Sequence, residues 1–374
     1  PERPYSDKRV RVFIDDARSF FKKTKKKYDA ICFGLLDAHT SSSNYNNVRL
    51  DHYVYTQESF KEAKGLLKPN GIMTIVFEVK REWIGDRIHH LLKETFNKEP
   101  LVFTIRTPAE LFGWGGVMYV TGFNISSIYS CLDGDKDLKN FVELNKTTYK
   151  GTQVKDSTDD WPYFYLRTNV IPVPYICIIL SLIIIFLIGT KTILSKAGNI
   201  NLHFLFLGAA FMLLEFQNIT KSSLLFGSTW IVNAYTITAL LFLILFANLI
   251  THFFDIKNMK ITYFLLCLSL LLIYAIPLNK TGIHNYYFKA IFIMTFLNLP
   301  VLFAGIIFIN SFKNSPNKNV ALGSNILGAG LGGLFESLSF ITGIKSLVLL
   351  VIIFYISSFY FGKNSVFLGF KKSA

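Results

Sequence analysis

The stretch YDAICFGLLDAH, residues 28–39, decides how the first part of this chain is interpreted. A Tyr-Asp pair leads into four apolar residues, which predicts a strand covered on both faces. Gly34, Asp37 and His39 follow at the carboxyl end of that strand, where open α/β sheets place their ligands. The stretch therefore predicts a buried strand that runs into a ligand-facing loop.

The residues around this stretch alternate between strand and helix patterns. Strands are predicted, in chain order, at 9–16, 28–36, 72–79, 101–107 and 115–123. Helices are predicted through Phe20 and Phe21, at 57–68 and at 81–96. Thr56 is the expected N-cap of the second helix, with Glu58 in its first turn and Lys68 near its end. This alternation predicts an α/β fold with a mostly parallel, doubly wound sheet.

The composition of the chain changes near Arg167. All but three of the 25 acidic residues come before this point, and every basic residue after it is a lysine. We therefore expect a soluble part followed by a membrane part. The expected division is residues 1–125 for the α/β domain, 126–170 for an extension and membrane-interface linker, and 171–374 for a transmembrane bundle of about seven helices.

The net charge of +14 does not by itself indicate nucleic-acid binding. Most of the excess lies in short loops between apolar runs, where lysines face headgroups and water. No nucleic-acid-binding module is recognisable in the sequence. The four cysteines lie far apart, without the spacing of metal ligands or disulfides. We expect neither a nucleic-acid partner nor a bound metal.

Seven apolar runs are long enough, or nearly so, to cross a bilayer core of about 30 Å, which takes about 20 helical residues. They are 171–190, 202–219, 230–251, 261–278, 290–310, 320–342 and 346–361. They lack the polar face of an amphipathic surface helix. The runs predict a multi-pass integral membrane protein whose principal partner is the lipid bilayer.

Two of these runs contain an acidic residue, Glu215 in the second and Glu336 in the sixth. An ionisable residue within a span costs about 3 kcal/mol on insertion scales and usually faces the bundle interior. Glu336 follows Ser324, Gly328 and Gly332 at intervals of four, which predicts a smooth face for close helix packing and for a contact between copies of the chain. A proton, cation or substrate site and simple helix packing both remain open.

Three stretches, taken in order, resemble a known family: RVFIDDARSFF (11–21), YDAICFGLLDAH (28–39) and LDHYVYTQESFKEAKGLLKPNGIMTIVF (50–77). They resemble the second half of the spermidine synthase-like fold, a branch of the S-adenosylmethionine-dependent methyltransferase superfamily. With the later DDWPYFYLR, the chain looks closest to membrane-fused spermidine synthase-like proteins of bacteria. The resemblance implies a partial Rossmann-like domain followed by an all-α multi-pass bundle, placed in the bacterial inner membrane.

The resemblance also assigns candidate site residues. Asp16 with Ala17 matches the pair that contacts the adenine of the nucleoside, where a carboxylate accepts from the exocyclic amine. A helix-capping role for Asp16 is the open alternative. In the catalytic loop, which is Asp-x-x-Asp-Pro in aminopropyl transferases, Gly34 replaces the first acid and Asp37 retains the second. This departure puts polyamine synthesis in question.

The same loop supplies the candidate bases. An amine must lose a proton before it attacks a sulfonium, so Asp37 and His39 are the catalytic candidates. Asp51 and Tyr55 are candidate contacts to the amine or polyamine-like acceptor. The resemblance implies S-adenosylmethionine or its decarboxylated form as the second substrate. The superfamily's glycine-rich turn and ribose-binding acid have no counterpart in this sequence, so half of the nucleoside site is expected to be missing.

Three functions follow from these patterns. The first is a membrane-anchored transferase of aminopropyl or methyl groups to an amine or a membrane-associated acceptor. Gly34 motivates the second, a degenerate nucleoside-binding sensor or scaffold, and Glu215 with Glu336 motivates the third, a transporter.

Two further expectations concern the membrane. By the positive-inside rule, the lysine counts of the loops place the soluble part outside the cytoplasm. A nucleoside substrate, however, is found in the cytoplasm, and we therefore expect the soluble part there. The aromatic residues of 156–167 are expected at the membrane interface, with a lid over a cation as the alternative.

Overall fold

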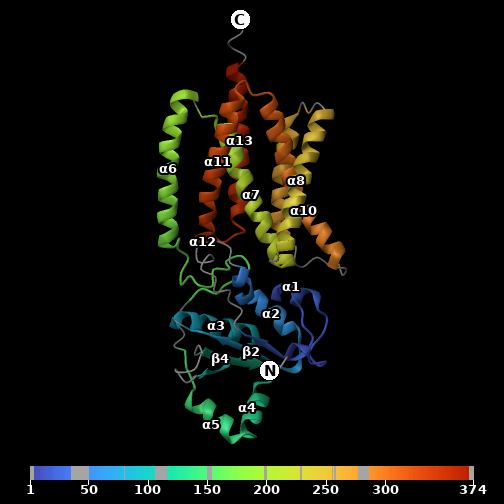
Figure 1. Cartoon of the computed structure of the whole chain (residues 1–374), viewed down its shortest axis with the longest axis vertical. Coiled ribbons are helices and arrows are strands. Elements are labelled where there is room, and N and C mark those ends of the chain that lie inside the picture. The colour runs from blue at the N-terminus through green and yellow to red at the C-terminus, as the bar shows by residue number, and fades with distance from the viewer. Residues whose placement is uncertain are drawn as a thin grey trace. The chain divides into compact units, whose positions relative to one another are not determined.

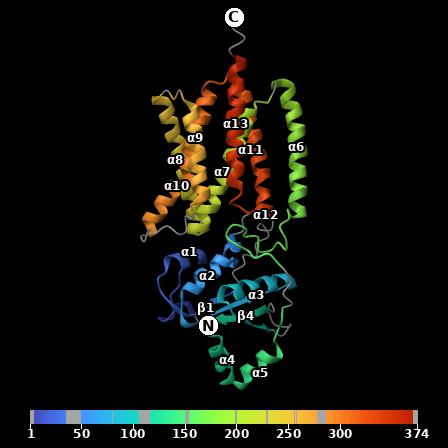
Figure 2. The same cartoon turned by 180° about the vertical axis from the view of Figure 1, so that it is seen from behind.

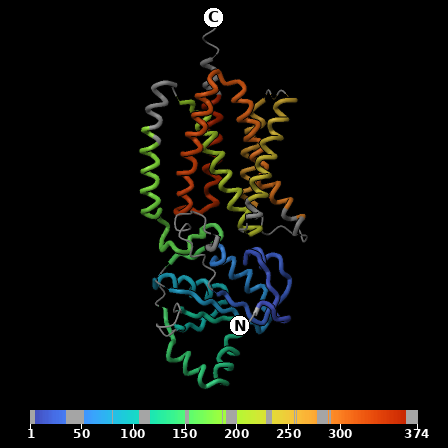
Figure 3. The backbone as a smooth tube through the Cα atoms, viewed as in Figure 1, coloured from blue at the N-terminus to red at the C-terminus, as the bar shows by residue number. Residues whose placement is uncertain are grey.

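The computed structural model describes residues 4–34, 50–79, 81–105, 116–149, 154–197, 200–227, 230–254, 256, 258–276 and 286–369, whose path Figure 3 traces. The described residues group into two compact units. The first unit extends to Asp159 and also includes the described residues of 223–232. The second begins at Asp160 and contains most of the C-terminal helices.

The first unit contains one four-stranded sheet. Its strands are β1 (Tyr28–Phe33), β2 (Leu67–Phe77), β3 (Leu101–Ile105) and β4 (Gly116–Gly122), in the order β1-β2-β4-β3. β1 and β2 are parallel, whereas β4 is antiparallel to both of its neighbours. The expectation of a mostly parallel sheet is therefore wrong. β3 and β4 follow each other in the chain as an antiparallel pair, which needs no crossover helix.

Helices cover both faces of this sheet (Figure 1). The elements are η1 (Pro4–Ser6), α1 (Ala17–Lys23), η3 (Leu50–Tyr55), α2 (Gln57–Gly65), α3 (Glu82–Phe96), α4 (Ile125–Asp133) and α5 (Lys136–Leu144). The fully buried side chains between the sheet and the α2/α3 layer include Phe60, Met73, Ile75, Ile88 and Leu91. On the opposite face, a smaller cluster joins β3 and β4 to α4 and α5.

Three local predictions in the first unit are corrected. No strand forms at 9–16, where residues 10–14 have no regular structure and Ile14 is fully exposed. In the sheet formed by the described residues, β1 is an edge strand with exposed residues rather than a strand covered on both faces. Lys68 lies in β2 rather than near the end of α2, because α2 ends at Gly65 and β2 begins at Leu67. Residues 69–71 also lie inside β2, where the register with β1 shifts.

All seven apolar runs of the C-terminal part are helical, and Figure 2 shows these helices from behind. The elements are α6 (Val173–Ala197), α7 (Leu202–Phe226), α8 (Trp230–Phe253), α9 (Met259–Ala275), α10 (Tyr286–Lys313), α11 (Lys318–Phe335), η5 (Glu336–Leu338), α12 (Ser339–Thr342) and α13 (Leu347–Gly369). Three segments of the described residues are long and apolar enough to cross a membrane: Leu202–Phe226, Ala234–Phe253 and Ile291–Lys313. The sixth run is not one helix, because α11 gives way to η5 at Glu336.

The small residues of α11 pack against α7 of the same chain. A Cβ built on Gly328 would lie 1.9 Å from the carbonyl oxygen of Leu205, and one on Gly208 would lie 2.0 Å from that of Asn325. Gly332 makes a similarly close approach to Ala209. The predicted face for close helix packing is confirmed, but α7 occupies it. A contact between copies through the sixth apolar run stays a prediction.

Three aromatic residues that follow Asp160 are buried in the second unit: Trp161, Tyr163 and Phe164. Trp161 and Tyr163 are each 1% exposed and pack with Phe340. Trp161 Nε1 donates to the carbonyl of Phe340 at 2.7 Å. Trp161 and Tyr163 therefore belong to the protein core here, and the expectation of an interfacial aromatic belt is wrong for them, because each ring has found a protein partner.

Candidate functional site

Asp16 lies at the N-terminus of α1 and caps that helix. Its Oδ1 accepts from the backbone N–H of Ser19 at 2.9 Å, and its carbonyl accepts from Phe20 at 2.9 Å. The capping interpretation is confirmed. A carboxylate has about four acceptor positions, so a capping Asp16 retains capacity for a further donor. Contact of Asp16 and Ala17 with adenine stays a prediction.

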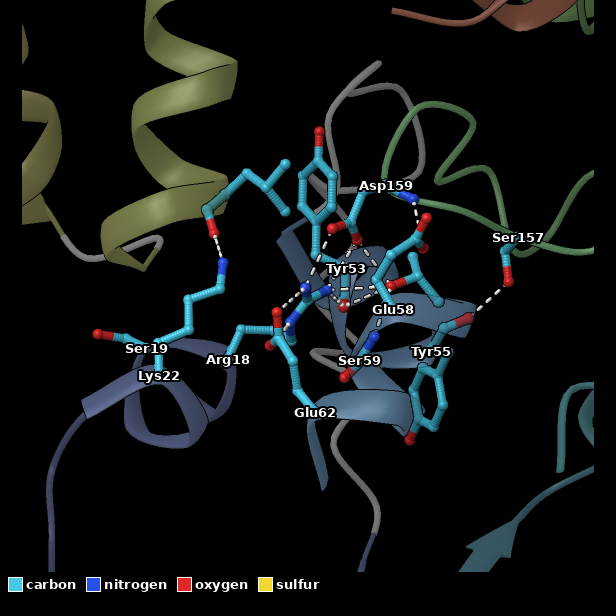
Figure 4. A network of polar contacts seen from close by, with 12 residues as sticks. Arg18, Ser19, Lys22, Tyr53, Tyr55, Glu58, Ser59, Glu62, Ser157 and Asp159 are labelled. Carbon is cyan, nitrogen blue, oxygen red and sulfur yellow. Dashed lines mark hydrogen bonds and ion pairs between the residues drawn. The ribbon is translucent and has the colours of Figure 1, made fainter. Parts of the chain in front are cut away.

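Arg18, the residue after this pair, is at the centre of a buried network of polar contacts (Figure 4). Its side chain is 2% exposed. Nε and Nη2 donate to the Glu62 carboxylate at 2.9 and 3.2 Å, while Nη1 and Nη2 donate to the Asp159 carboxylate at 2.9 and 3.1 Å. Nη1 also donates to the carbonyl of Tyr53 at 2.6 Å. The planar guanidinium suits this arrangement because it presents its donors as a rigid fork.

Asp159 connects this network to the start of α2. Thr56, the predicted N-cap, accepts from the backbone N–H of Ser59 and donates to Asp159 Oδ1 at 2.8 Å. The backbone N–H of Asp159 donates to Glu58 Oε2 at 2.9 Å. A carboxylate near a helix N-terminus is favoured by the exposed N–H groups there. The cap prediction for Thr56 and the first-turn position of Glu58 are confirmed.

The network holds the segment that carries two candidate acceptor contacts. Ser157 Oγ donates to the carbonyl of Tyr55 at 2.5 Å, two residues beyond the Tyr53 carbonyl that Arg18 holds. Tyr55 is 1% exposed and packs edge-on against Phe77. Asp51 lies in η3, and its side chain is outside the described part. Acceptor binding by Asp51 and Tyr55 stays a prediction.

The charges of this network shift several pKa values. Burial lowers the pKa of Arg18 most strongly, but Asp159 and Glu62 outweigh it, so the net pKa is raised and the guanidinium stays charged. Burial lowers the pKa of Lys22 to about 8, with the charge of Arg18 adding to the effect. Burial and the charge of Asp159 raise the pKa of Glu58.

The remaining predicted site residues either lie outside this network or are not described by the structure. Asp37 and His39 are outside the described residues, and Gly34 follows β1 in an exposed position. Glu215 is half-buried inside α7, where it makes no hydrogen bond or ion pair with any described residue. Glu336 is half-buried at the start of η5. A functional role for either glutamate stays a prediction.

A separate cavity of about 770 Å³ lies beside α3 and the start of β3. Its lining includes His89, Glu99, Lys146 and Tyr149. His89 Nε2 lies 3.0 Å from Glu99 Oε2. Burial lowers the pKa of His89, and this effect exceeds that of the Glu99 charge, which raises the pKa. None of the candidate site residues that the structure describes lines this cavity.

Sequence reasoning missed Arg18 and Glu62, and it considered Asp159 only as part of the segment 156–167, for which a lid over a cation was the alternative. A signal existed for two of them. Arg18 directly follows the Asp-Ala pair, and Glu62 lies four residues after Glu58, on the same face of α2. Asp159 had no such local signal, because its partners are far away in the chain.

Comparison with known proteins concerns the same part of the chain. Residues 2–120 match the family model described as the spermine/spermidine synthase domain. The chain is 36% identical over 120 residues to polyamine aminopropyltransferase 2 of Aquifex aeolicus, and 29% identical over 115 residues to polyamine aminopropyltransferase of Saccharolobus solfataricus. Each match covers 31% of this chain.

The matches span only part of each relative, 22% of the Aquifex aeolicus protein and 36% of the Saccharolobus solfataricus protein. Polyamine aminopropyltransferase 2 of Hyperthermus butylicus is 27% identical, over 33% of its own length. The first third of this chain is therefore a spermidine synthase-like part, and it is followed by a helical part with three long apolar helices.

Proposed function

We propose that this protein is a membrane-anchored spermidine synthase-like transferase. It moves an aminopropyl or methyl group from a sulfonium nucleoside to an amine or a membrane-associated acceptor. The observation that carries the proposal is the match of residues 2–120 to the spermine/spermidine synthase domain. Decarboxylated S-adenosylmethionine is the donor that this family relationship favours, and S-adenosylmethionine is the alternative.

The chemistry needs few protein groups. The sulfonium is already an electrophile, so the protein has to orient the two reactants and remove a proton from the attacking amine. Asp16 and Ala17 contact the adenine in this proposal, and the position of Asp16 at the start of α1 supports it. Asp37, assisted by His39, accepts the proton, while Asp51 and Tyr55 contact the acceptor. The amine nitrogen forms the new bond as the sulfonium carbon–sulfur bond breaks.

A turnover assay with matched variants tests this proposal. The purified protein is supplied with decarboxylated S-adenosylmethionine and a di- or polyamine, and release of methylthioadenosine is measured. S-adenosylmethionine is run in parallel, with S-adenosylhomocysteine as its product. Asp37→Asn should lower kcat/KM by about 10²- to 10⁴-fold because the proton acceptor is lost. Asp29→Asn is the control, since Asp29 is 84% exposed on β1 and pairs only with Lys68 among the described residues.

No product with any polyamine or lipid amine would contradict the transferase. Gly34, at the position of the principal acid in aminopropyl transferases, favours a second candidate in that case, a nucleoside-binding sensor or scaffold. Calorimetric binding of methylthioadenosine without turnover would support it. Turnover would exclude it.

The membrane anchor is part of the same proposal. Three helical segments with the length and composition of membrane spans support it. So do the exposed apolar side chains of α6 and α8, among them Ile185, Ile188, Leu241 and Phe242. We place the soluble part in the cytoplasm, where the nucleoside substrate is. Cysteine labelling from each side of intact vesicles tests this orientation, and labelling of the soluble part from outside would reverse it.

A further inference from the structure

We propose that Arg18 is a positioning residue for the acceptor segment, and that Ser157 and Asp159, beyond the matched domain, complete this device. The inference rests on the proposed function in one respect, which is that η3 carries the acceptor contacts Asp51 and Tyr55. The contacts themselves lie entirely within the first unit (Figure 4).

Arg18 acts through its neighbours rather than on a ligand. Its side chain is 2% exposed, and its donors are directed to Glu62, Asp159, Thr56 and the carbonyl of Tyr53. A guanidinium surrounded in this way has no open face for a substrate. It is, however, the second residue of the helix that Asp16 caps, so its position is fixed to the predicted adenine contact by two peptide bonds.

The carbonyls of η3 accept hydrogen bonds from two distant parts of the first unit, in addition to the Thr56 hydroxyl next to the helix. The last carbonyls of a short helix lack partners within the helix and need donors from elsewhere. Arg18 Nη1 supplies the carbonyl of Tyr53 at 2.6 Å, and Ser157 Oγ supplies the carbonyl of Tyr55 at 2.5 Å. These two donors come from α1 and from residue 157, so they fix the last turn of η3 from two parts of the unit.

Asp159 holds the guanidinium in the orientation that this contact requires. Its two carboxylate oxygens accept from Nη1 and Nη2, which fixes both the position and the plane of the fork. The same carboxylate accepts from Thr56, and the backbone carbonyl of Ser157 accepts from the N–H of Gln57 at 2.9 Å. The segment 157–159 therefore joins η3, the start of α2 and Arg18.

A lysine cannot reproduce this arrangement. Its ammonium group has three donors and is not planar, whereas the planar guanidinium of Arg18 donates to four partner residues at once. Arg18→Lys should therefore preserve the charge but release η3. Asp159→Asn retains one acceptor and removes the charge, and Ser157→Ala removes only the contact with the carbonyl of Tyr55. Lys68→Met, which removes an exposed ion pair with Asp29 in the same unit, is the control.

Hydrogen exchange followed by mass spectrometry tests positioning without any substrate. In Arg18→Lys and Asp159→Asn, amides of the 50–59 segment, including Gln57 and Ser59, should exchange about tenfold faster or more. Peptides from β2 and β4 should be unchanged, as should all peptides in Lys68→Met. Unchanged exchange at 50–59 would overturn the inference. Uniformly faster exchange throughout the first unit would also overturn it, because it would show that the substitution destabilises the whole unit rather than releasing η3.

Kinetics then test the link to function. Acceptor KM should rise about tenfold or more in Arg18→Lys, while the Kd for methylthioadenosine changes by less than about threefold. If acceptor KM and the Kd for methylthioadenosine rise by the same factor in Arg18→Lys, the first unit has lost its fold. Ser157→Ala, the milder change, then decides, because it should raise the acceptor KM more than the Kd for methylthioadenosine. If the wild-type protein turns over no amine, the transferase proposal fails, whereas the exchange result still confirms or overturns the role of Arg18.

Discussion

Arg18 and Asp159 are 141 residues apart in the sequence and are joined by two hydrogen bonds, from Nη1 to Oδ1 at 2.9 Å and from Nη2 to Oδ2 at 3.1 Å. One partner lies in α1, within the residues matched by the spermine/spermidine synthase domain, and the other lies almost 40 residues beyond them. The first unit therefore extends past the matched domain, since the partner of Arg18 in this ion pair comes from the segment 154–159.

Removing Arg18 should strongly destabilise the first unit. Arg18→Met leaves Glu62 and Asp159, which are 29% and 15% exposed, without their shared cation, and such a loss typically costs about 3–5 kcal/mol. The double variant Arg18→Met/Asp159→Asn should recover part of this cost, so that the two changes are non-additive by about 1–3 kcal/mol. Thermal and denaturant unfolding followed by tryptophan fluorescence measures both, with Arg9→Met at an exposed ion pair as a control without measurable effect.

Two substitutions distinguish the capping role of Asp16 from its predicted contact with adenine. Asp16→Ser retains a capping oxygen but removes the carboxylate, whereas Asp16→Ala removes both. The alanine variant should therefore lose about 1 kcal/mol of stability, and the serine variant much less. Methylthioadenosine binding, measured by calorimetry, should weaken in both variants if the carboxylate contacts the adenine. Full binding by Asp16→Ser would leave Asp16 as a helix cap alone.

The half-buried Lys22 should make stability depend on pH above neutrality. Burial lowers its pKa from 10.5 to about 8, so between these values the unfolded chain binds more protons than the folded one. Stability should therefore rise as the pH rises from about 8 to about 10, because the buried charge is relieved. Lys22→Met should reduce this rise in melting temperature by the share that Lys22 contributes. Lys23→Met, at the adjacent exposed lysine that pairs with Asp15, should preserve it, and parallel curves for wild type and Lys22→Met would contradict the assignment.

Close packing of α7 against α11 should tolerate no methyl group at Gly328. Its Cβ would lie 1.9 Å from the carbonyl oxygen of Leu205, so Gly328→Ala must push the helices apart, at a cost of about 1–3 kcal/mol or more. Gly323→Ala, in the same helix with open space around it, should be neutral or stabilising by up to about 1 kcal/mol. Melting temperatures in detergent compare the two variants. A similar effect at both glycines would indicate that helix propensity dominates.

Local patterns predicted the elements correctly where the determining interactions are local. The N-cap Thr56, the amphipathic helix α3 and the helices described in the apolar runs follow from residues within one or two turns of each other. The small-residue face of α11 was also visible as a spacing of four. Such features depend on hydrogen bonds and side-chain periods that repeat within a helix, and these are encoded in consecutive residues.

Sequence patterns alone predicted the strand β1, the division of the chain into a polar and an apolar part, and the resemblance of three stretches within 11–77 to a known family. The three-dimensional structure was needed to show that the described sheet is mixed with β1 at its edge, and that Arg18 binds Asp159 and Glu62. Strand order and long-range ion pairs depend on which distant segments come into contact as the chain folds. The local periodicity of the sequence does not encode these contacts.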